Sequence, residues 1–165
     1  MVTTLAYVGL GGNLALPARQ IGVALHRLAG WPGVAALRAS QLYRTAPWGR
    51  DDQPPFVNAV AEVHYVGEPE ALLRALLAIE REAGRSRGAE RWGPRLLDLD
   101  LLLFGQRRIA LHGLTVPHPH IAQRAFVLVP LAELAPEALI PGVGKVSACL
   151  DAIDASQVAE LDCLH

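Results

Sequence analysis

Hydrophobic residues recur along this 165-residue chain with two different periods, and these periods predict its secondary structure. Apolar, β-prone runs predict strands over residues 4–10, 34–43, 57–66 and 96–104. Apolar positions at helical spacing predict helices that begin at Pro17 and Glu68, and a third over residues 123–134 despite Pro130. In the second helix the expected buried stripe consists of Leu72, Leu73, Leu76, Leu77 and Ile79. Residues 45–55 are rich in proline and residues 84–95 in glycine, so both segments are expected to be irregular.

The predicted elements follow the order β-α-β-β-α-β, and a C-terminal extension comes after them. This order is typical of a ferredoxin-like α+β fold, in which two helices cover one face of an antiparallel sheet. In the strand over residues 57–66, alternation places Val57, Ala59, Ala61 and Val63 on one face. A hydrophobic fraction of 52% and a length near that of an average domain predict a single domain, residues 1–165.

Charge and cysteine content narrow the setting in which the chain acts. A net charge of −1 gives no reason to expect a nucleic-acid or membrane partner. Cys149 and Cys163 lie far from any metal-ligand spacing, and two thiols in such a chain fit a reducing cytoplasm. The sequence also has no apolar stretch as long as a membrane span. We therefore expect a cytoplasmic protein.

Two aspartates, Asp98 and Asp100, alternate with leucines in the last predicted strand. Alternation places both acids on one face and the leucines on the other, namely Leu97, Leu99, Leu101 and Leu103. The Cα atoms of the two acids then lie roughly 7 Å apart. Carboxylates at this spacing suit Mg²⁺, which needs few protein ligands when substrate phosphates complete its shell. The alternative is a half-exposed strand with two solvated acids.

The segment over residues 84–95 favours the metal interpretation. It contains Trp92, three glycines and four arginines, which are Arg85, Arg87, Arg91 and Arg95. Guanidinium groups bind phosphate oxygens bidentately, although a solvated basic loop is the common alternative. A basic, glycine-rich loop beside an aspartate pair indicates phosphoryl transfer from Mg-ATP, in which the metal neutralises charge and arginines hold the phosphate chain.

Two other polar positions leave alternatives open. Glu80 continues the apolar stripe of the second helix toward the arginine segment, so a ligand contact, an arginine-positioning role and a pair with Arg85 all fit it. His118-Pro119-His120 resembles a metal pair, but without a third soft ligand nearby a phosphate contact or a surface role is favoured.

Two nucleotide-binding motifs are incomplete in this chain. Residues 9–14 begin like a dinucleotide-binding fingerprint, but Leu14 replaces the last glycine. Gly144-Lys145-Val146 lacks both the upstream glycine and the Ser or Thr of a P-loop.

The segment ERWGPRLLDLD, residues 90–100, closely resembles the signature of the 6-hydroxymethyl-7,8-dihydropterin pyrophosphokinases. Four other segments, residues 10–14, 43–54, 56–59 and 114–126, are similar to parts of the same family. The resemblance implies a ferredoxin-like α-β-α sandwich with a mostly antiparallel sheet. It also implies an enzyme of folate biosynthesis that transfers the β,γ-diphosphate of Mg-ATP to the hydroxymethyl group of 6-hydroxymethyl-7,8-dihydropterin and releases AMP.

The resemblance implies roles for individual residues as well. Asp98 and Asp100 would hold two Mg²⁺ ions that bridge the ATP phosphates, and Arg85 and Arg95 would assist transfer as catalytic residues. The implied ATP contacts are Glu80, Arg87, Arg91, Trp92, Leu101, Thr115, His118 and Arg124. The implied pterin contacts are Thr45, Ala46, Trp48, Phe56, Asn58, Trp92 and Phe126. Among these, the two phenylalanines would stack on the flat heterocycle and the asparagine amide would bind its edge.

The chain departs from the family's usual pattern at six positions, which are Ala46, Trp48, Phe56, Leu77, Gly113 and Pro119. These departures weaken the adenosine-side contacts that the resemblance implies. They leave the aspartate pair and the loop arginines untouched.

Two rival functions come from other classes of protein. An RNA-binding module on a ferredoxin-like sheet needs an aromatic RNP1-type strand and a basic overall charge, and the sequence has neither. An inactive paralogue kept as a structural partner is disfavoured because Asp98, Asp100, Arg85 and Arg95 are all retained. We therefore expect a monomeric enzyme whose partners are ATP and hydroxymethyl-dihydropterin, with no nucleic acid and no membrane.

Overall fold

The computed structural model describes residues 2–13, 16–45, 54–85 and 97–161, without the side chain of Arg85. The elements up to the last expected strand are β1 (Thr4–Gly12), α1 (Pro17–Ala29), β2 (Val34–Ala39), β3 (Tyr43–Thr45), β4 (Phe56–Tyr65), α2 (Pro69–Arg85) and β5 (Asp98–Phe104). The elements after it are β6 (Ile109–Leu111), β7 (Leu114–Val116), a 3₁₀ helix (Ile121–Gln123), α3 (Ala125–Leu134), β8 (Leu139–Ile140), β9 (Gly144–Lys145), α4 (Val146–Asp151) and β10 (Val158–Glu160).

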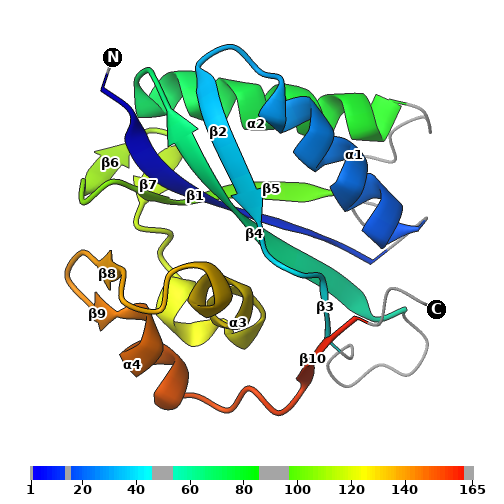
Figure 1. Cartoon of the computed structure of the whole chain (residues 1–165), viewed down its shortest axis with the longest axis vertical. Helices are drawn as coiled ribbons and strands as arrows, with labels where there is room; N and C mark the ends of the chain where they lie inside the picture. Colours follow the sequence, from blue (N-terminus) through cyan, green and yellow to red (C-terminus); the bar gives the residue numbers. More distant parts are fainter. Residues whose placement is uncertain (1, 14–15, 46–53, 86–96, 162–165) are drawn as a thin grey trace.

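The main sheet has the strand order β10-β3-β4-β1-β5, and β2 also pairs with β4. Every pair of neighbours in it is antiparallel. The observed order up to β5 is β-α-β-β-β-α-β, which differs from the predicted β-α-β-β-α-β by one additional strand, and the C-terminal extension adds β10 to the edge of the same sheet (Figure 1).

The strand expected over residues 34–43 is two strands, β2 and β3, which pair with successive parts of β4. Ser40 causes the break. Its backbone N–H donates to the Val60 carbonyl at 2.8 Å, and its hydroxyl oxygen accepts from the Val60 N–H at 2.9 Å. A side-chain oxygen thus replaces a backbone carbonyl in the ladder, and β3 starts again at Tyr43.

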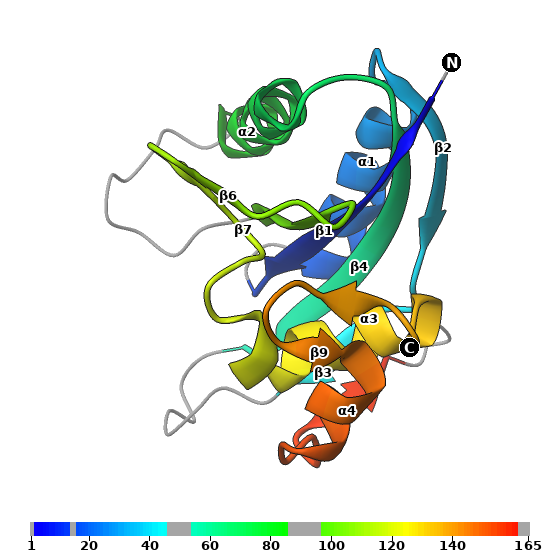
Figure 2. The same ribbon diagram turned by 90° about the vertical axis from the view of Figure 1, so that its left-hand side faces the viewer.

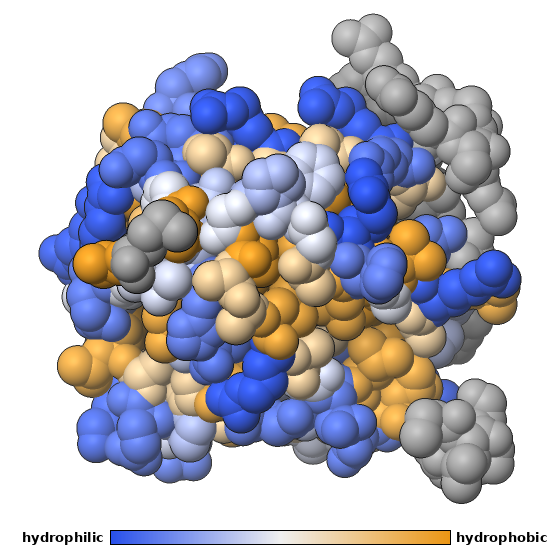
Figure 3. Space-filling view, turned by 45° about the horizontal axis from the view of Figure 1, so that its top comes forward, coloured by the Kyte–Doolittle hydropathy of each residue, from blue (hydrophilic) through white to orange (hydrophobic). Residues whose placement is uncertain are grey.

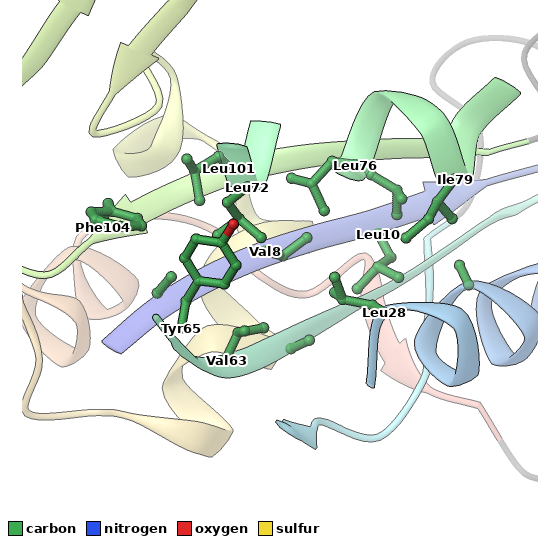
Figure 4. Close-up of a cluster of buried hydrophobic side chains, with 14 of the residues drawn as sticks. Val8, Leu10, Leu28, Val63, Tyr65, Leu72, Leu76, Ile79, Leu101 and Phe104 are labelled. Atoms are coloured by element: carbon green, nitrogen blue, oxygen red, sulfur yellow. The ribbon is translucent and has the colours of Figure 1, made fainter. Parts of the chain in front are cut away.

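Helices cover both faces of the sheet, so the expectation of two helices on one face was incomplete and the α-β-α sandwich is confirmed. α1 and α2 lie over one face, and α3 and α4 lie over the other (Figures 1 and 2). The core under α1 and α2 contains the four β4 residues that were expected to share a face, which are Val57, Ala59, Ala61 and Val63. Figure 4 shows Val63 in this core beside Tyr65. A second core lies under α3 and α4, and it contains Tyr7, Val60 and Leu128.

The buried stripe of α2 is narrower than the sequence indicates. Leu72, Ala75, Leu76 and Ile79 are buried, whereas Leu77 is 43% exposed and Leu73 is partly buried. Leu73 and Leu77 follow the buried leucines by one residue, which turns them about 100° around the helix toward solvent. The helix also continues through Arg85, so the irregular segment does not begin at Gly84.

A bulge in β5 changes the face to which its last leucines point. The register pairs Val8 with Leu101 but Tyr7 with Leu103, so Leu102 is an extra residue in the strand. Leu103 therefore lies in the core under α3 and α4, and its expected place beside Leu97, Leu99 and Leu101 was wrong.

The third helix begins later than the sequence predicts. Gln123 belongs to the 3₁₀ helix, and α3 runs from Ala125 to Leu134 with Pro130 inside it.

In the space-filling view with α1 and α2 turned forward, hydrophilic residues surround areas of hydrophobic surface (Figure 3). Within the described ranges, no helix has both the length and the apolar character of a membrane span.

Candidate active site

A cavity of about 570 Å³ lies between the sheet and the start of α3. Its walls come from the end of β1, the starts of β4 and β5, and the segment that leads into α3. Eight residues predicted for the site line it together: Thr45, Phe56, Asn58, Asp98, Asp100, His118, Arg124 and Phe126. The fold thus brings residues more than 80 positions apart in the sequence to one cavity.

Asp98 and Asp100 are half-buried and point to the cavity side of β5, while Leu97, Leu99 and Leu101 are buried on the other side. The neighbouring strand β1 places a glycine opposite each acid, with Gly11 beside Asp98 and Gly9 beside Asp100. Because glycines have no side chain, the side chains of Leu102 and Asn58 can lie over Gly9 and Gly11, and the two carboxylates line the cavity beside them.

Asn58 lies on the far side of Gly11 in the same cross-strand row. β4 pairs Asn58 with Gly11 on one side and with Tyr43 of β3 on the other. Two strand spacings separate Asp98 from Asn58, which is about 10 Å along the row. The row therefore has the carboxylate of Asp98 at one end, the amide of Asn58 at the other, and Gly11 between them; Gly9 and Gly11 together form the glycine floor beside the two aspartates.

Two buried polar atoms lie at the β3–β4 end of the cavity. Among the described residues, Thr45 Oγ1 and Asn58 Oδ1 are the buried side-chain atoms that have no hydrogen-bond partner. Leaving such an atom unpaired costs about 1–3 kcal/mol, so a ligand that hydrogen-bonds to both atoms would recover this free energy. Two phenylalanines, Phe56 and Phe126, also line the cavity and supply aromatic surface. Phe56 is 39% exposed.

Glu80 holds the backbone of β5 between the two aspartates. Its Oε2 accepts a hydrogen bond from the Leu99 N–H at 2.6 Å. A helix carboxylate thus binds an amide of the edge strand at the point where the acids project. Of the alternatives left open for Glu80, a positioning role fits this contact, although the group that it positions is a strand backbone.

His118 lies near Asp100 and Arg124 at the entrance to α3. Burial lowers the pKa of His118, the Arg124 and His120 charges lower it further, and Asp100 opposes them. Its Nδ1 accepts the His120 N–H at 3.2 Å, so the proton of the neutral imidazole is on Nε2. His118 lines the cavity, whereas His120 contacts His118 through its backbone N–H and is not among the lining residues. This arrangement favours a ligand contact by His118 over a metal site formed by the two histidines.

Arg124 occupies the N-cap position of α3, where its side chain makes no capping hydrogen bond, and it lines the cavity. Its guanidinium carbon lies 5.7 Å from the centroid of the Phe126 ring, which orients the cation beside the aromatic wall.

Three of the predicted contacts, Glu80, Leu101 and Thr115, are not among the residues that line the cavity. Leu101 is buried under α1 and α2, so a ligand could reach it only through its backbone. Thr115 is exposed on the short strand β7. Ala46, Trp48, Arg87, Arg91, Trp92 and Arg95 lie outside the described residues, as does the side chain of Arg85.

Sequence reasoning missed the two floor glycines and Asn13, which is 5% exposed and lines the cavity. The segment at residues 11–13 predicted only a turn. The available signal was the alternation of Gly9 and Gly11 within an apolar strand, because glycine inside a strand often marks close approach of a ligand.

The donor set of the aspartate pair suits magnesium. The two carboxylates supply hard oxygen ligands on one face, and the glycines opposite leave room for the phosphates that would complete the shell. The residues that would hold the ion are therefore Asp98 and Asp100.

Known proteins match this chain over most of its length. The family model for 7,8-dihydro-6-hydroxymethylpterin-pyrophosphokinase (HPPK) matches residues 7–136. The 2-amino-4-hydroxy-6-hydroxymethyldihydropteridine pyrophosphokinase of Pseudomonas aeruginosa is 51% identical over 135 residues, covering 82% of this chain and 83% of the relative. The protein of the same name from Methylorubrum extorquens is 42% identical over 139 residues, covering 84% and 87%.

Solved structures with the same fold are more distant in sequence. A crystal structure of HPPK-DHPS in complex with substrates has a TM-score of 0.75 at 12% identity, and it covers 98% of this chain. A Plasmodium falciparum HPPK-DHPS structure has a TM-score of 0.74 at 14% identity and covers 96%. This chain spans about half of each of those longer chains, 47% and 48%. The family match and the close relatives together show that this chain belongs to the 7,8-dihydro-6-hydroxymethylpterin-pyrophosphokinase family.

Proposed function

We propose that this protein transfers the β,γ-diphosphate of ATP to the hydroxymethyl group of 6-hydroxymethyl-7,8-dihydropterin, with release of AMP. One observation carries the proposal: a single cavity has two carboxylates on one side and buried, unpaired polar atoms beside aromatic rings on the other. Such a cavity suits a charged phosphate chain at one end and a flat heterocycle with hydrogen-bonding edges at the other.

The pterin side of the site is formed by Thr45, Phe56, Asn58 and Phe126. The amide oxygen of Asn58 accepts hydrogen bonds, so it suits an amino or ring N–H group of the pterin. The Thr45 hydroxyl can donate or accept. Phe56 and Phe126 contact the faces of the ring, which excludes water and fixes its plane.

The phosphate side is formed by Asp98, Asp100, His118 and Arg124. The two aspartates would hold Mg²⁺, for which we propose two ions, and the metal would neutralise the phosphate charge when ATP is bound. The neutral imidazole of His118 donates from Nε2, and the guanidinium of Arg124 binds phosphate oxygens. The loop arginines Arg85 and Arg95 complete the proposal as further phosphate ligands.

The chain's residues contribute orientation and charge to this reaction, with no covalent enzyme intermediate. Gly9 and Gly11 would let the phosphate chain lie close to the β1 backbone, and in-line transfer would require the pterin hydroxymethyl oxygen to face the β-phosphorus within the cavity. Glu80 keeps the aspartates on one face by binding the Leu99 amide between them. We propose that the protein acts as a cytoplasmic monomer on these two small molecules.

We expect the Asp98→Ala variant to lose Mg²⁺-dependent ATP binding and at least about a hundredfold in turnover, because the phosphate charge loses a metal ligand. AMP release from ATP and hydroxymethyl-dihydropterin measures turnover, and calorimetry with and without Mg²⁺ measures ATP binding. The matched control is Asp151→Ala, which removes an exposed aspartate at the end of α4 and should keep wild-type activity. An Asp98→Ala enzyme with normal turnover would contradict the metal assignment.

A further inference from the structure

The short strand β3 forms part of the pterin side of the cavity. It has three residues, and its register places Tyr43 opposite Asn58 and Thr45 opposite Phe56. The other edge of β3 is covered by β10, which is also three residues long. Because so few ladder bonds hold β3, its position depends on contacts outside the sheet.

Glu133, an exposed residue in the last turn of α3, makes these contacts. Its Oε1 and Oε2 accept the Gln41 N–H at 3.0 and 3.1 Å, and Oε1 also accepts the Tyr43 hydroxyl at 2.7 Å. Hydrogen bonds to a carboxylate are stronger than those between neutral groups. Burial, followed by the hydrogen bond and charge of Glu133, raises the pKa of Tyr43 above its ordinary value, so the hydroxyl keeps its proton at neutral pH.

The Gln41 amide lies in the break between β2 and β3, outside the paired residues of β4. Glu133 therefore binds the chain just before β3 and again on β3 itself. The other end of the same helix carries Arg124 and Phe126 into the cavity. One carboxylate thus joins β3 to the helix that forms the opposite wall of the site.

We propose that Glu133 is a positioning residue for the pterin side of the active site. Through Tyr43 and the Gln41 amide it fixes β3, and with it Thr45, at a set distance from α3 and beside Asn58 of β4. The aspartate pair is insulated from this contact, because three strand spacings, about 14 Å, separate β3 from β5. Loss of Glu133 should therefore weaken pterin binding and leave ATP binding unchanged, provided that the protein has the proposed pyrophosphokinase activity.

The test compares Glu133→Ala, Glu133→Gln and Tyr43→Phe with the wild type at a temperature where all are folded. We expect the KM for hydroxymethyl-dihydropterin to rise about fivefold in Glu133→Ala, as for the loss of one net hydrogen bond, while the Kd for Mg-ATP stays within twofold. Glu133→Gln retains one acceptor oxygen and should give an intermediate KM. Tyr43→Phe combined with Glu133→Ala should add little to Glu133→Ala alone, because both changes remove the same bond.

Glu137→Ala is the matched control. Glu137 follows α3 closely in sequence but pairs with Lys145 at 2.9 Å and has no part in the β3 contact, so both constants should remain at wild-type values. An unchanged pterin KM in Glu133→Ala, or an equal loss of pterin and ATP binding, would overturn the proposal. If Glu133→Ala does not fold, Glu133→Gln and Tyr43→Phe decide it by the same comparison. Absence of turnover in the wild type would instead contradict the proposed function.

Discussion

Gly11 lies between Asp98 and Asn58, and the absence of a side chain at this position makes room for the amide of Asn58. A Cβ atom at Gly11 would overlap Asn58 Nδ2 and lie 3.4 Å from Asn58 Cγ. The asparagine would have to rotate away from the cavity. We expect Gly11→Ala to raise the Kd for hydroxymethyl-dihydropterin about tenfold, equivalent to about 1.4 kcal/mol, as measured by titration with the pterin.

Gly22→Ala is the control for this substitution, because a Cβ atom at Gly22 has no neighbour within 4 Å. Gly22 lies in α1, where the change from glycine to alanine should stabilise the helix by up to about 1 kcal/mol without altering ligand binding. Equal pterin affinity in Gly11→Ala and the wild type would show that the orientation of Asn58 does not determine pterin binding.

The break between β2 and β3 depends on the hydroxyl of Ser40, a residue that is 8% exposed. In Ser40→Ala the N–H of the fully buried Val60 would lose its acceptor. Such a loss costs about 1–3 kcal/mol, and we expect the free energy of unfolding measured with urea to fall by this amount. The start of β3 would also lose part of its anchorage to β4.

The exposed serine Ser156 supplies the control for the Ser40 substitution. Ser156→Ala should change the free energy of unfolding by less than about 0.5 kcal/mol, as surface substitutions usually do. If Ser40→Ala proved as stable as Ser156→Ala, the hydroxyl would not be a necessary part of the β4 ladder.

Strong periodicity made most elements predictable from the sequence. β4 alternates clearly and α2 has a regular apolar stripe, so both were located within a few residues of their observed bounds. The break at Ser40 and the bulge at Leu102 were not predictable, because each depends on the partner strand across the sheet. The sequence of one strand shows which of its residues alternate between faces, but it does not show how they pair with the residues of a neighbouring strand.

The same limit applies to the candidate site. The aspartate pair was predictable because both acids belong to one strand and alternation places them on one face. The glycine floor was not, since it requires knowledge that β1 lies between β5 and β4. The contacts of Glu133 with Gln41 and Tyr43 join residues about 90 positions apart, and neither segment carries a local signal for them.

At the scale of the whole molecule, the active site begins where the second core ends. On the face under α3 and α4, β1 changes from the buried Tyr7 to Gly9 and Gly11. β4 changes one row later, from Val60, which is paired with Gly9, to Asn58, which is paired with Gly11. In β5 the buried Leu102 and Leu103 of the second core are preceded by Asp100 and Asp98, which line the cavity. Three adjacent strands therefore give up apolar packing together, which creates a cavity on a sheet whose other face stays fully packed.

The phenol of Tyr7, in the second core, should make the stability of the whole protein fall at alkaline pH. Burial, the charge of Glu62 and a 3.1 Å hydrogen bond to it raise the pKa of Tyr7 to about 12. Above pH 10 the unfolded chain releases this proton and the folded protein keeps it, so the free energy of unfolding should fall until about pH 12, by at most about 1.4 kcal/mol per pH unit. Urea denaturation of the wild type and Tyr7→Phe should therefore give parallel pH dependences from pH 7 to 9 and a shallower fall for Tyr7→Phe above pH 10. Identical slopes above pH 10 would mean that Tyr7 does not keep its proton in the folded state.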